Sequence, residues 1–422
     1  MSAAAQLAHH LGYIVTGCDL KPSSNYSGPL EKVRLKISTG HSADHLKDID
    51  ILAVTPAVFY DSDSHPEVVQ ARERGILMKW QEFMGKYLHE GKFLICVAGT
   101  HGKSTTTALA GLLLENAELD PVVEVGATVK EWQNNLRVGK GDYFISEADE
   151  FHDNFIYYHP NIIILNNIEM DHPEYFSDMK KLMNTFQSFV NNLLPNGVLI
   201  FNADSENNQK LVQQITRSDI KLVPYTLSEF DTYGYTLSIP GDHNKSNALG
   251  IIKLAEFLKI PAEAIAKTFT NFKGVGRRLD LIGEKDGIKV YDDYANLPTA
   301  FAANISSLKQ LYPTSKFLVV IEPHTFSRLR AVLPDLPKSL ARADKIIFTK
   351  TFASREKDPG DFSSQDLVDY TNKHLDNDKA SLINEFGDIA SFIKKEAKPN
   401  DIVLVMAAGS GHIISREILN SL

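Results

Sequence analysis

The chain has 422 residues, a formal net charge of −9 and a pI near 5.9, and this acidic balance argues against general nucleic-acid binding. Its length allows two to four domains, and its two cysteines, Cys18 and Cys96, exclude a framework of disulfides or zinc sites, as fits a reducing cytoplasm. Because no segment approaches 18 apolar residues and the N-terminus lacks a leader-like pattern, we expect a cytoplasmic chain without membrane insertion.

Short apolar runs alternate with amphipathic stretches along the whole chain, which predicts α/β layers with mainly parallel sheets. The first block predicts strands at 13–16, 33–37, 51–54 and 76–78, and helices at 43–49 and 66–74. A doubly wound sheet of this kind binds ligands at the carboxyl ends of its strands. Asp19 follows the first predicted strand, where it could hold a ribose, and a turn or a helix cap would explain this aspartate equally well.

The second block begins near residue 91 and contains the most informative segment of the chain. It predicts strands at 93–97, 143–146, 162–165 and 198–201, and helices at 103–114, 180–193 and 247–258. Residues 98–107 read AGTHGKSTTT, between the first of these strands and the first of these helices. This layout is typical of a phosphate cradle, shortened here because Val97 stands where the general P-loop has its first glycine. The alternative interpretation is a surface turn rich in glycine and threonine.

The cradle residues each have a predicted task. Gly99 and Gly102 let backbone N–H groups approach phosphates, Lys103 reaches the terminal phosphates, and the Ser104 hydroxyl ligates Mg²⁺. The expected nucleotide-binding residues of this segment are Gly99, Thr100, His101, Gly102, Lys103, Ser104 and Thr105.

Acidic residues follow the next two predicted strands. In SEADEF (146–151) we expect Glu147 to hold Mg²⁺ opposite Ser104, with Asp149 and Glu150 as supporting or substrate contacts. In NNIEMDHPEYF (166–176), three acids and a histidine could hold a second metal ion, and His172 is the best candidate ligand. An ordinary acidic turn and a structural histidine are the alternative interpretations.

Two further segments of this block carry polar side chains. In PGDHNKSNALG (240–250), His243, Asn244 and Asn247 could read an adenine edge or cap the following helix. In GVGRRLD (274–280), Arg277 and Arg278 could clamp a transferring phosphoryl group, and a solvated basic turn is the alternative.

The third block begins near residue 279. It predicts strands at 289–291, 317–321, 345–349 and 402–406 and a helix at 299–312. Asp292 and Asp293 follow the first of these strands and could hold a ribose. His324 and Arg328 follow the second strand and could hold a carboxylate or a phosphate.

Taken in this order, the motifs resemble those of the Mur ligases, the ATP-dependent amino-acid ligases of peptidoglycan synthesis. That family reads GTHGK[ST]TT, EADE, NIExDH, GxHNxxN, GVxRR, DDYxHHP and PHx[YF][ST]R, and this chain matches each motif wholly or in large part. The resemblance covers essentially the full length and is greatest to the alanine-adding branch. Gln187 stands where several other branches have a carbamylated lysine, which the alanine-adding branch also lacks.

The resemblance implies three domains: a UDP-sugar-binding Rossmann-like domain at 1–88, a central P-loop ATP-binding domain at 89–277, and a Rossmann-like amino-acid-binding domain at 278–422. It implies ATP and Mg²⁺ as cofactors, and UDP-N-acetylmuramate and an amino acid, expected to be L-alanine, as substrates. The muramate carboxylate would become an acyl phosphate, which the amine attacks to form an amide. We expect a monomer or a weak homodimer.

The resemblance also assigns roles residue by residue. The catalytic residues would be Lys103, Arg278, His172 and Glu147, and the metal-site residues Ser104, Glu147 and His172. The nucleoside contacts would be His243, Asn244, Asn247 and Asp293. The substrate contacts would be Asp19, Asp149, Glu150, Tyr294, Asn296, His324 and Arg328.

Three departures from the family pattern leave other interpretations open. The family begins with a strand and a loop like GIGGxGMS, and the sequence printed here starts at its Met-Ser, so we expect an N-terminal domain without that strand and loop. Asn296 and Leu297 replace the His-His pair after DDY, and AAGSGH (407–412) replaces GAGD. The alternatives are a murein tripeptide ligase, a folylpolyglutamate-type ligase, and a catalytically impaired binder of UDP-sugar and ATP.

Overall fold

The computed structural model describes residues 1–20, 28–61, 63–354, 356–375 and 378–422. It divides into two compact units. Unit 1 contains Met1–Glu169, Met179–Glu229 and Ala248–Phe269, and unit 2 contains Met170–Asp178, Phe230–Asn247 and Thr270–Leu422. Helices alternate with mainly parallel strands in both units, which confirms the predicted α/β class. No helix among the described residues combines the length and the apolar character that spanning a bilayer requires.

The N-terminal part of unit 1 differs from the predicted single sheet. Its elements are α1 (Ser2–His10), β1 (Thr16–Asp19), α2 (Gly28–Lys32), β2 (Lys36–Thr39), η1 (Ala43–Leu46), β3 (Leu52–Val54), η2 (Pro56–Asp61), α3 (Pro66–Glu73), β4 (Leu77–Lys79), α4 (Trp80–Phe83) and η3 (Met84–Leu88). Among the described residues, β1 pairs only with β2 and β3 only with β4, so two small parallel sheets form.

Three predicted elements of this part were placed wrongly, and one of them is the strand expected at 33–37, which lies at Lys36–Thr39. The first strand begins at Thr16 rather than at residue 13, because the chain is still closing the last turn of α1 at Gly12 and Ile14 is 96% exposed. The predicted helix at 43–49 is a 3₁₀ turn, η1, in which only Leu46 is buried. One buried residue is too little to stabilise a longer amphipathic helix here.

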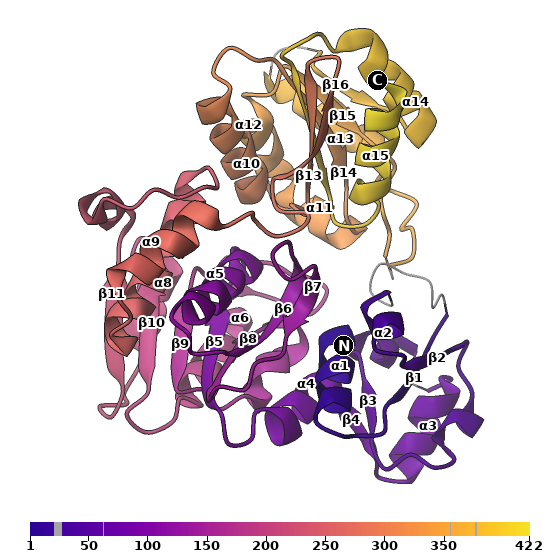
Figure 1. Ribbon diagram of the computed structural model, residues 1–422. Helices are drawn as coiled ribbons and strands as arrows, with labels where there is room; N and C mark the ends of the chain where they lie inside the picture. The colour runs from indigo at the N-terminus through magenta and orange to yellow at the C-terminus, as the bar shows by residue number, and fades with distance from the viewer. Residues whose placement is uncertain (21–27, 62, 355, 376–377) are drawn as a thin grey trace. The chain divides into compact units, whose positions relative to one another are not determined.

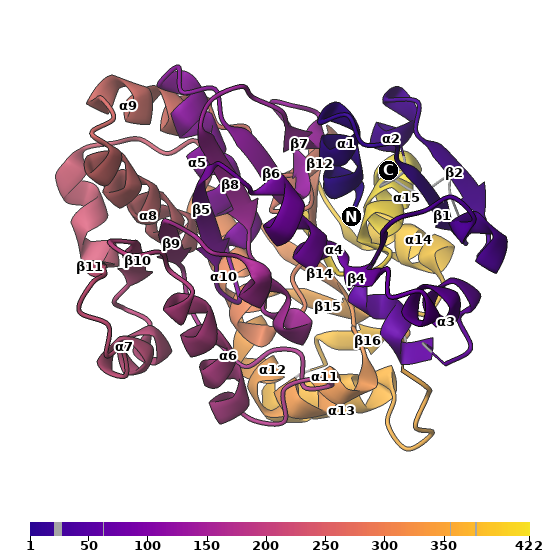
Figure 2. The same cartoon turned by 90° about the horizontal axis from the view of Figure 1, so that it is seen from below.

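The large sheet of unit 1 has the order β11-β10-β9-β5-β8-β6-β7, which runs from left to right in Figure 2. Its strands are β5 (Phe93–Ala98), β6 (Val122–Val129), β7 (Asn134–Arg137), β8 (Tyr143–Glu147), β9 (Ile162–Leu165), β10 (Val198–Asn202) and β11 (Lys221–Tyr225). The four predicted strands, β5, β8, β9 and β10, occupy its centre, because their apolar runs are buried on both faces. Strands β6, β7 and β11 were not predicted from the sequence. They lie toward the edges of the sheet and carry polar residues.

Helices complete this part of the chain. They are α5 (Lys103–Asn116), η4 (Phe151–Tyr157), α6 (Met179–Asn191), α7 (Glu206–Gln213), η5 (Leu227–Tyr233), α8 (Asp242–Leu258) and α9 (Ala262–Asn271). The predicted helices at 103–114, 180–193 and 247–258 correspond to α5, α6 and α8. Since β5 is central and α5 begins five residues after it, the connecting glycine loop lies at the carboxyl edge of the sheet.

Unit 2 contains a six-stranded sheet of order β12-β13-β17-β14-β15-β16, parallel except for the β12–β13 hairpin. Its elements are β12 (Asp280–Lys285), β13 (Ile288–Asp293), α10 (Pro298–Leu311), β14 (Phe317–Glu322), α11 (Phe326–Val332), η6 (Leu333–Asp335), α12 (Leu336–Leu340), β15 (Lys345–Phe348), α13 (Ser364–Leu375), β16 (Ala380–Leu382), α14 (Phe386–Glu396), β17 (Ile402–Ala407) and α15 (Gly411–Ser421). One buried apolar cluster joins the sheet to α10, α12 and α13, and another joins it to α14 and α15. Figure 1 shows the resulting three layers.

Candidate active site

The loop between β5 and α5 has the backbone conformation of a phosphate cradle. Gly99 and Gly102 have φ of 135° and 79°, in the region that glycine adopts readily. A Cβ atom on Gly99 would lie 2.8 Å from the carbonyl oxygen of Asn167. Gly102 is the residue before α5, so the loop leads directly into the free N–H groups of the first helical turn. These N–H groups and the helix dipole favour an anion at this place.

The segment after β9 holds this loop in place. The Thr100 amide donates to the Asn167 carbonyl at 3.0 Å, and the His101 amide donates to the Asn167 side-chain oxygen at 2.9 Å. The Thr100 hydroxyl donates to the Glu169 carbonyl at 2.9 Å, and the His101 ring lies 2.8 Å from the Glu169 carboxylate. Asn167 and Glu169 were not predicted from the sequence to have this role. Their position after a buried strand adjacent to β5 was the available signal.

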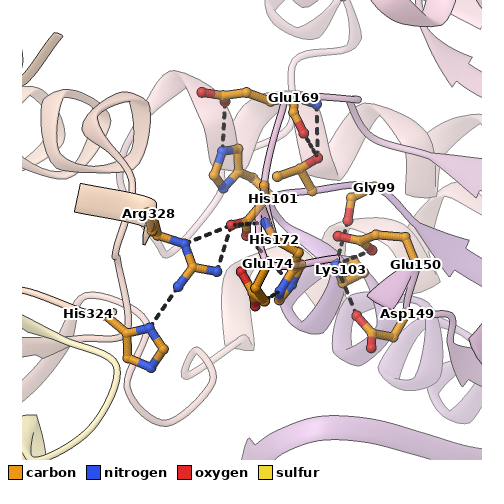
Figure 3. Close-up of polar contacts among 12 residues, drawn as sticks. Gly99, His101, Lys103, Asp149, Glu150, Glu169, His172, Glu174, His324 and Arg328 are labelled. Carbon is orange, nitrogen blue, oxygen red and sulfur yellow. Dashed lines mark hydrogen bonds and ion pairs between the residues drawn. The ribbon is translucent and has the colours of Figure 1, made fainter. Parts of the chain in front are cut away.

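Lys103 begins α5 and is surrounded by acceptors. Its Nζ lies 2.8 Å from a Glu150 oxygen, 2.6 Å from the Gly99 carbonyl and 3.8 Å from an Asp149 oxygen. Figure 3 shows these three residues around the lysine. Burial by itself would lower the pKa of Lys103, but the carboxylates of Glu150 and Asp149 outweigh it and raise the pKa above its ordinary value. The site therefore holds a permanent positive charge beside the cradle.

Ser104 and Glu147 form a pair of oxygen donors. The Ser104 hydroxyl donates to Glu147 Oε1 at 3.0 Å, and the Gly126 amide donates to Glu147 Oε2 at 2.6 Å. A Cβ atom on Gly126 would lie 2.8 Å from Glu147 Oε1, so a glycine is required there to leave the carboxylate in place. Mg²⁺ takes oxygen ligands at about 2.0–2.1 Å in an octahedron, which puts neighbouring ligand oxygens about 3 Å apart. The pair fits that spacing.

Unit 2 contains a buried acid–arginine cluster around Arg328 in α11. Its Nε and Nη2 lie 2.9 Å and 2.7 Å from Asp171 Oδ1, and its Nη1 lies 2.7 Å from His324 Nδ1. Arg328 is only 2% exposed. Figure 3 shows the guanidinium directed at His324 on one side. Arg328 and His324 were expected from the sequence to lie in the site, whereas Asp171 was not expected to be their partner.

Burial and charge move two pKa values in this cluster. Burial alone would raise the pKa of Asp171, but the charges of His172 and Arg328 lower it to about 2. Burial, with help from the Arg328 charge, lowers the pKa of His324 to about 4. Asp171 is therefore ionised and His324 neutral near pH 7, and the neutral imidazole can accept a hydrogen bond from Arg328.

His172 lies beside the same cluster. It adopts a φ of 54°, its Nδ1 lies 3.1 Å from Glu174 Oε1, and its Nε2 lies 3.7 Å from Asp171 Oδ2. The imidazole is thus held between two carboxylates. His172 belongs to unit 2, whereas Ser104 and Glu147 belong to unit 1.

The structure distinguishes the two arginines of GVGRR. Arg277 pairs with Asp292 at 3.1 Å and donates to the carbonyls of Ala407 and Ala408, which fastens the end of β17. Burial raises the pKa of Asp292 to about 6, although Arg277 opposes this. Arg278 is exposed and stacks on the Tyr294 ring, with its guanidinium carbon 5.1 Å from the ring centre. Arg277 also lies over this ring, at 5.2 Å, but it is half-buried, so Arg278 is the more exposed of the two.

Several other residues that we expected to contact ligands form hydrogen bonds with groups of nearby loops. The Asp293 carboxylate accepts from the Leu279 and Ala295 amides, each at 2.7 Å. In the first turn of α8, Asn244 donates to the Pro240 carbonyl at 2.6 Å, and Asn247 donates to Asn244 at 3.4 Å. These side chains therefore organise the loops in which they lie. Lone pairs and N–H groups that these bonds do not use could still meet a ligand.

The remaining expected site residues differ in their exposure. Thr105 is buried in the first turn of α5, whereas Asp19 is exposed at the end of β1. His243 and Asn296 are half-buried, in α8 and just before α10 respectively.

The comparisons with known proteins indicate a single family. The chain matches "Mur ligase family, catalytic domain" over residues 1–91, "Mur ligase middle domain" over 97–236, and "Mur ligase, glutamate ligase domain" over 277–409. It is 35% identical to the UDP-N-acetylmuramate–L-alanine ligase of Alkaliphilus metalliredigens, over 99% of this chain and 94% of that protein. It is 34% identical to the enzyme of the same name from Clostridium novyi, over 100% and 95% respectively.

Solved structures share the fold over the whole chain. The crystal structure of the UDP-N-acetylmuramate–alanine ligase of Thermotoga maritima matches with a TM-score of 0.80 and 24% identity, over 100% of this chain and 96% of that one. A murein peptide ligase of Psychrobacter arcticus matches with a TM-score of 0.72 and 22% identity, over the same shares. The order of the motifs, the cradle after β5 and these matches lead to one conclusion: the chain belongs to the Mur ligase family.

Proposed function

We propose that this chain is the ATP-dependent ligase that joins L-alanine to UDP-N-acetylmuramate in peptidoglycan synthesis. The relatives at 34–35% identity over the full chain carry that name. The observation that carries the proposal is the cradle between β5 and α5, where a charged lysine and a pair of Mg²⁺-type oxygen donors lie together. Those groups are what phosphoryl transfer to a carboxylate requires.

The proposed reaction has two steps. The muramate carboxylate attacks the γ-phosphoryl group of ATP, so that ADP leaves and an acyl phosphate forms. The uncharged amine of L-alanine then attacks the acyl carbon, phosphate leaves, and the amide is complete. Positioning and charge stabilisation provide most of the catalysis in phosphoryl transfer, so the contribution of this chain is mainly electrostatic.

We assign the charge stabilisation to Lys103 and Arg278. The Lys103 ammonium lies 2.6 Å from the Gly99 carbonyl, and the Glu150 carboxylate keeps it charged. It can therefore bind the terminal phosphates of ATP during the transfer. The Arg278 guanidinium is exposed and oriented by the Tyr294 ring. Each such contact in the transition state is worth about 3–4 kcal/mol.

The residues present fit Mg²⁺, and we propose that Ser104 and Glu147 hold it, with His172 at a second metal position. When bound, Mg²⁺ neutralises charge on the phosphates. The Gly126 amide orients Glu147, and Glu174 orients the His172 ring. Hydrogen bonds to ligands of this kind fix their orientation and tune the metal.

The remaining assignments follow the family motifs. We propose that His243, Asn244, Asn247 and Asp293 contact the nucleoside of ATP. We propose that Asp19, Asp149, Glu150, Tyr294, Asn296, His324 and Arg328 contact the acyl substrate or the amino acid. The Asp171–Arg328 pair supports the last of these, because it fixes a guanidinium beside His324.

We further propose the three domains 1–88, 89–277 and 278–422, which the three family matches at 1–91, 97–236 and 277–409 support. We place the reaction in the cytoplasm, where ATP is available. Both cysteines are free, which fits a reducing compartment. We propose a monomer or a weak homodimer without affinity for nucleic acid, which the net charge of −9 supports.

The test is phosphate release from ATP in the presence of UDP-N-acetylmuramate, with L-alanine, glycine, L-serine or the murein tripeptide as acceptor. We expect stimulation by L-alanine, and a loss on the order of 10²–10³ in kcat for Lys103→Ala. A matched control is Lys259→Ala, an exposed lysine after α8. Stimulation by the tripeptide alone would assign the chain to peptide recycling. Phosphate release without any acceptor would contradict ligase activity.

A further inference from the structure

Five side chains with metal-binding atoms gather at the carboxyl ends of β1 and β2, outside the site described above. Cys18 lies in β1, His41 follows β2, and His45 lies in η1. His65 caps the N-terminus of α3, and Glu67 lies in its first turn. Four of the five are histidine or cysteine, and Glu67 is 3% exposed. The proposed ligase reaction requires none of these five residues.

The donor atoms lie close together around Glu67. Cys18 Sγ is 3.1 Å and 3.2 Å from the two Glu67 oxygens and 3.4 Å from His41 Nδ1. His45 Nδ1 is 2.7 Å and His41 Nδ1 is 3.5 Å from Glu67 oxygens. In each of the sets Cys18–His45–Glu67 and His41–His65–Glu67, one donor atom per residue lies within 4.8 Å of the others.

Two of these separations match those of donors around one tetrahedral zinc ion. Zinc binds sulfur at about 2.3 Å and nitrogen or oxygen at about 2.0–2.2 Å, so neighbouring donors lie about 3.3–3.8 Å apart. The 3.4 Å between Cys18 and His41 and the 3.5 Å between His41 and Glu67 fall in this range. The contacts of Glu67 with His45 (2.7 Å) and with Cys18 (3.1 and 3.2 Å) are shorter, as direct hydrogen bonds should be, and would lengthen on metal binding.

His65 supplies an independent observation. Its Nδ1 accepts from the Val68 amide at 3.4 Å, and its Nε2 is buried without a hydrogen-bond partner among the described residues. The centres of the His65 and His41 rings lie 4.5 Å apart, so the His65 ring belongs to the cluster. A buried nitrogen without a partner is costly, and a metal ion would satisfy it. The Ser42 amide also donates to Glu67 at 3.2 Å, which orients the carboxylate.

We propose that this cluster is a binding site for a zinc-class divalent metal ion, with Cys18, Glu67 and two of the three histidines as ligands. Thiolate and imidazole donors favour zinc or cobalt over Mg²⁺, which prefers oxygen. The site is therefore chemically distinct from the Ser104–Glu147 pair. The sequence excluded a cysteine-based zinc framework, and this site needs only one cysteine. The metal would join β1, the turn after β2 and α3 into one rigid region.

Cobalt titration of the full chain tests this proposal. The protein is stripped with a chelator, kept reduced with a phosphine and titrated with Co²⁺. We expect thiolate-to-cobalt charge-transfer absorption that saturates at one equivalent, disappears on addition of Zn²⁺ and persists in excess Mg²⁺. Absence of this absorption in the intact chain would overturn the proposal.

Matched variants locate the site. We expect Cys18→Ser to abolish the charge-transfer absorption, and Glu67→Gln and His65→Gln to weaken Co²⁺ binding by more than about tenfold. Cys96→Ser removes the other cysteine, which is buried in β5, and His159→Gln removes an exposed histidine. Both should bind Co²⁺ like the parent chain. Unchanged absorption in Cys18→Ser, or its loss in Cys96→Ser alone, would refute the assignment.

A second measurement needs no variant. One equivalent of Zn²⁺ should slow alkylation of Cys18 in the parent chain, as detected by peptide mass spectrometry, because a zinc-bound thiolate is less accessible to the reagent. Equal alkylation with and without Zn²⁺ would contradict a role for Cys18 as a ligand.

Discussion

The buried pair of Asp171 and Arg328 should contribute strongly to the stability of unit 2. Arg328 is 2% exposed, and two of its nitrogens lie 2.9 Å and 2.7 Å from one Asp171 oxygen. Asp171→Asn keeps the shape of the side chain and its acceptor for the His172 amide, but it removes the negative charge. The guanidinium then stays buried without its counter-charge. Breaking a buried pair in this way costs about 3–5 kcal/mol.

The pKa of Asp171 gives a second, independent value for the stability that ionised Asp171 contributes. It falls from an ordinary 3.8 to about 2 in the folded protein. At about 1.4 kcal/mol per pKa unit, ionised Asp171 contributes about 2–3 kcal/mol at pH 7. Because the folded pKa is the lower one, this contribution is fully present above about pH 5 and is lost as the pH falls through about 2. We therefore expect Asp171→Asn to lower the stability of unit 2 by about 3 kcal/mol at pH 7.

Hydrogen exchange of the core strands β14 and β17 measures this loss. A chain with several domains does not unfold in one step, so a local readout in unit 2 is needed. A loss of about 3 kcal/mol corresponds to exchange faster by about a hundredfold. Near pH 2.5 the difference between the variant and the parent chain should shrink, because Asp171 is then partly protonated in both states of the parent.

The exposed pair of Arg330 and Asp361 provides the control. Arg330 lies in the same helix as Arg328, but the two side chains of this pair are 45% and 66% exposed. Asp361→Asn should therefore cost less than about 1 kcal/mol. Equal effects of the two substitutions, or an effect of Asp171→Asn that does not shrink in acid, would refute the reasoning.

Three further predictions concern the cradle and the histidine beside Arg328. Gly99→Ala should weaken ATP binding by at least about tenfold in calorimetry, since its φ of 135° and the Asn167 carbonyl at 2.8 Å oppose a Cβ atom. The control is Gly234→Ala, which also has a positive φ, 69°, but has open space around it and lies outside the cradle, so ATP binding should not change. Ser104→Ala should raise the Mg²⁺ concentration for half-maximal phosphate release about tenfold, because one oxygen donor is lost, and an unchanged requirement would contradict that role. His324 has a pKa of about 4 in the folded protein, so it should not titrate between pH 5.5 and 8 in NMR spectra. Its pKa in the unfolded chain is the ordinary 6.5, so the stability that neutral His324 contributes is fully present above pH 6.5 and is lost as the pH falls toward 4. A His324 midpoint near 6.5 would show that the ring is not buried as described.

Central strands could be predicted from the sequence, whereas edge strands could not. The apolar runs that became β5, β9 and β10 are buried on both faces, so nothing else fits their composition. Strand β11 has one buried residue, Tyr225, and contains Pro224, and β7 is NNLR, so neither stands out from a loop. The first strand begins three residues later than predicted, because the Tyr13 amide still donates to the Ala8 carbonyl in the turn that follows α1.

The candidate site shows the same division. Lys103 and Ser104 were identified from the glycine spacing, because a phosphate cradle depends on residues a few positions apart. Glu147 was identified because it ends the next predicted strand, and parallel strand ends meet at one edge of the sheet. The partners came from contacts distant in sequence. Asp171 and Arg328 are separated by 157 positions, and Lys103 and Glu150 by 47. No local pattern encodes such distances.

By itself, the sequence determined the α/β class, the phosphate cradle and the resemblance to the Mur ligases, since each depends on periodicity or on motifs within a few residues. Only the tertiary structure decided which of Arg277 and Arg278 fastens β17 and which is the more exposed, because the two are identical in type and adjacent in the chain. It alone gathered Cys18, three histidines and Glu67 from four separate elements. Burial and side-chain contact arise when elements pack together, and packing is not a property of any local segment.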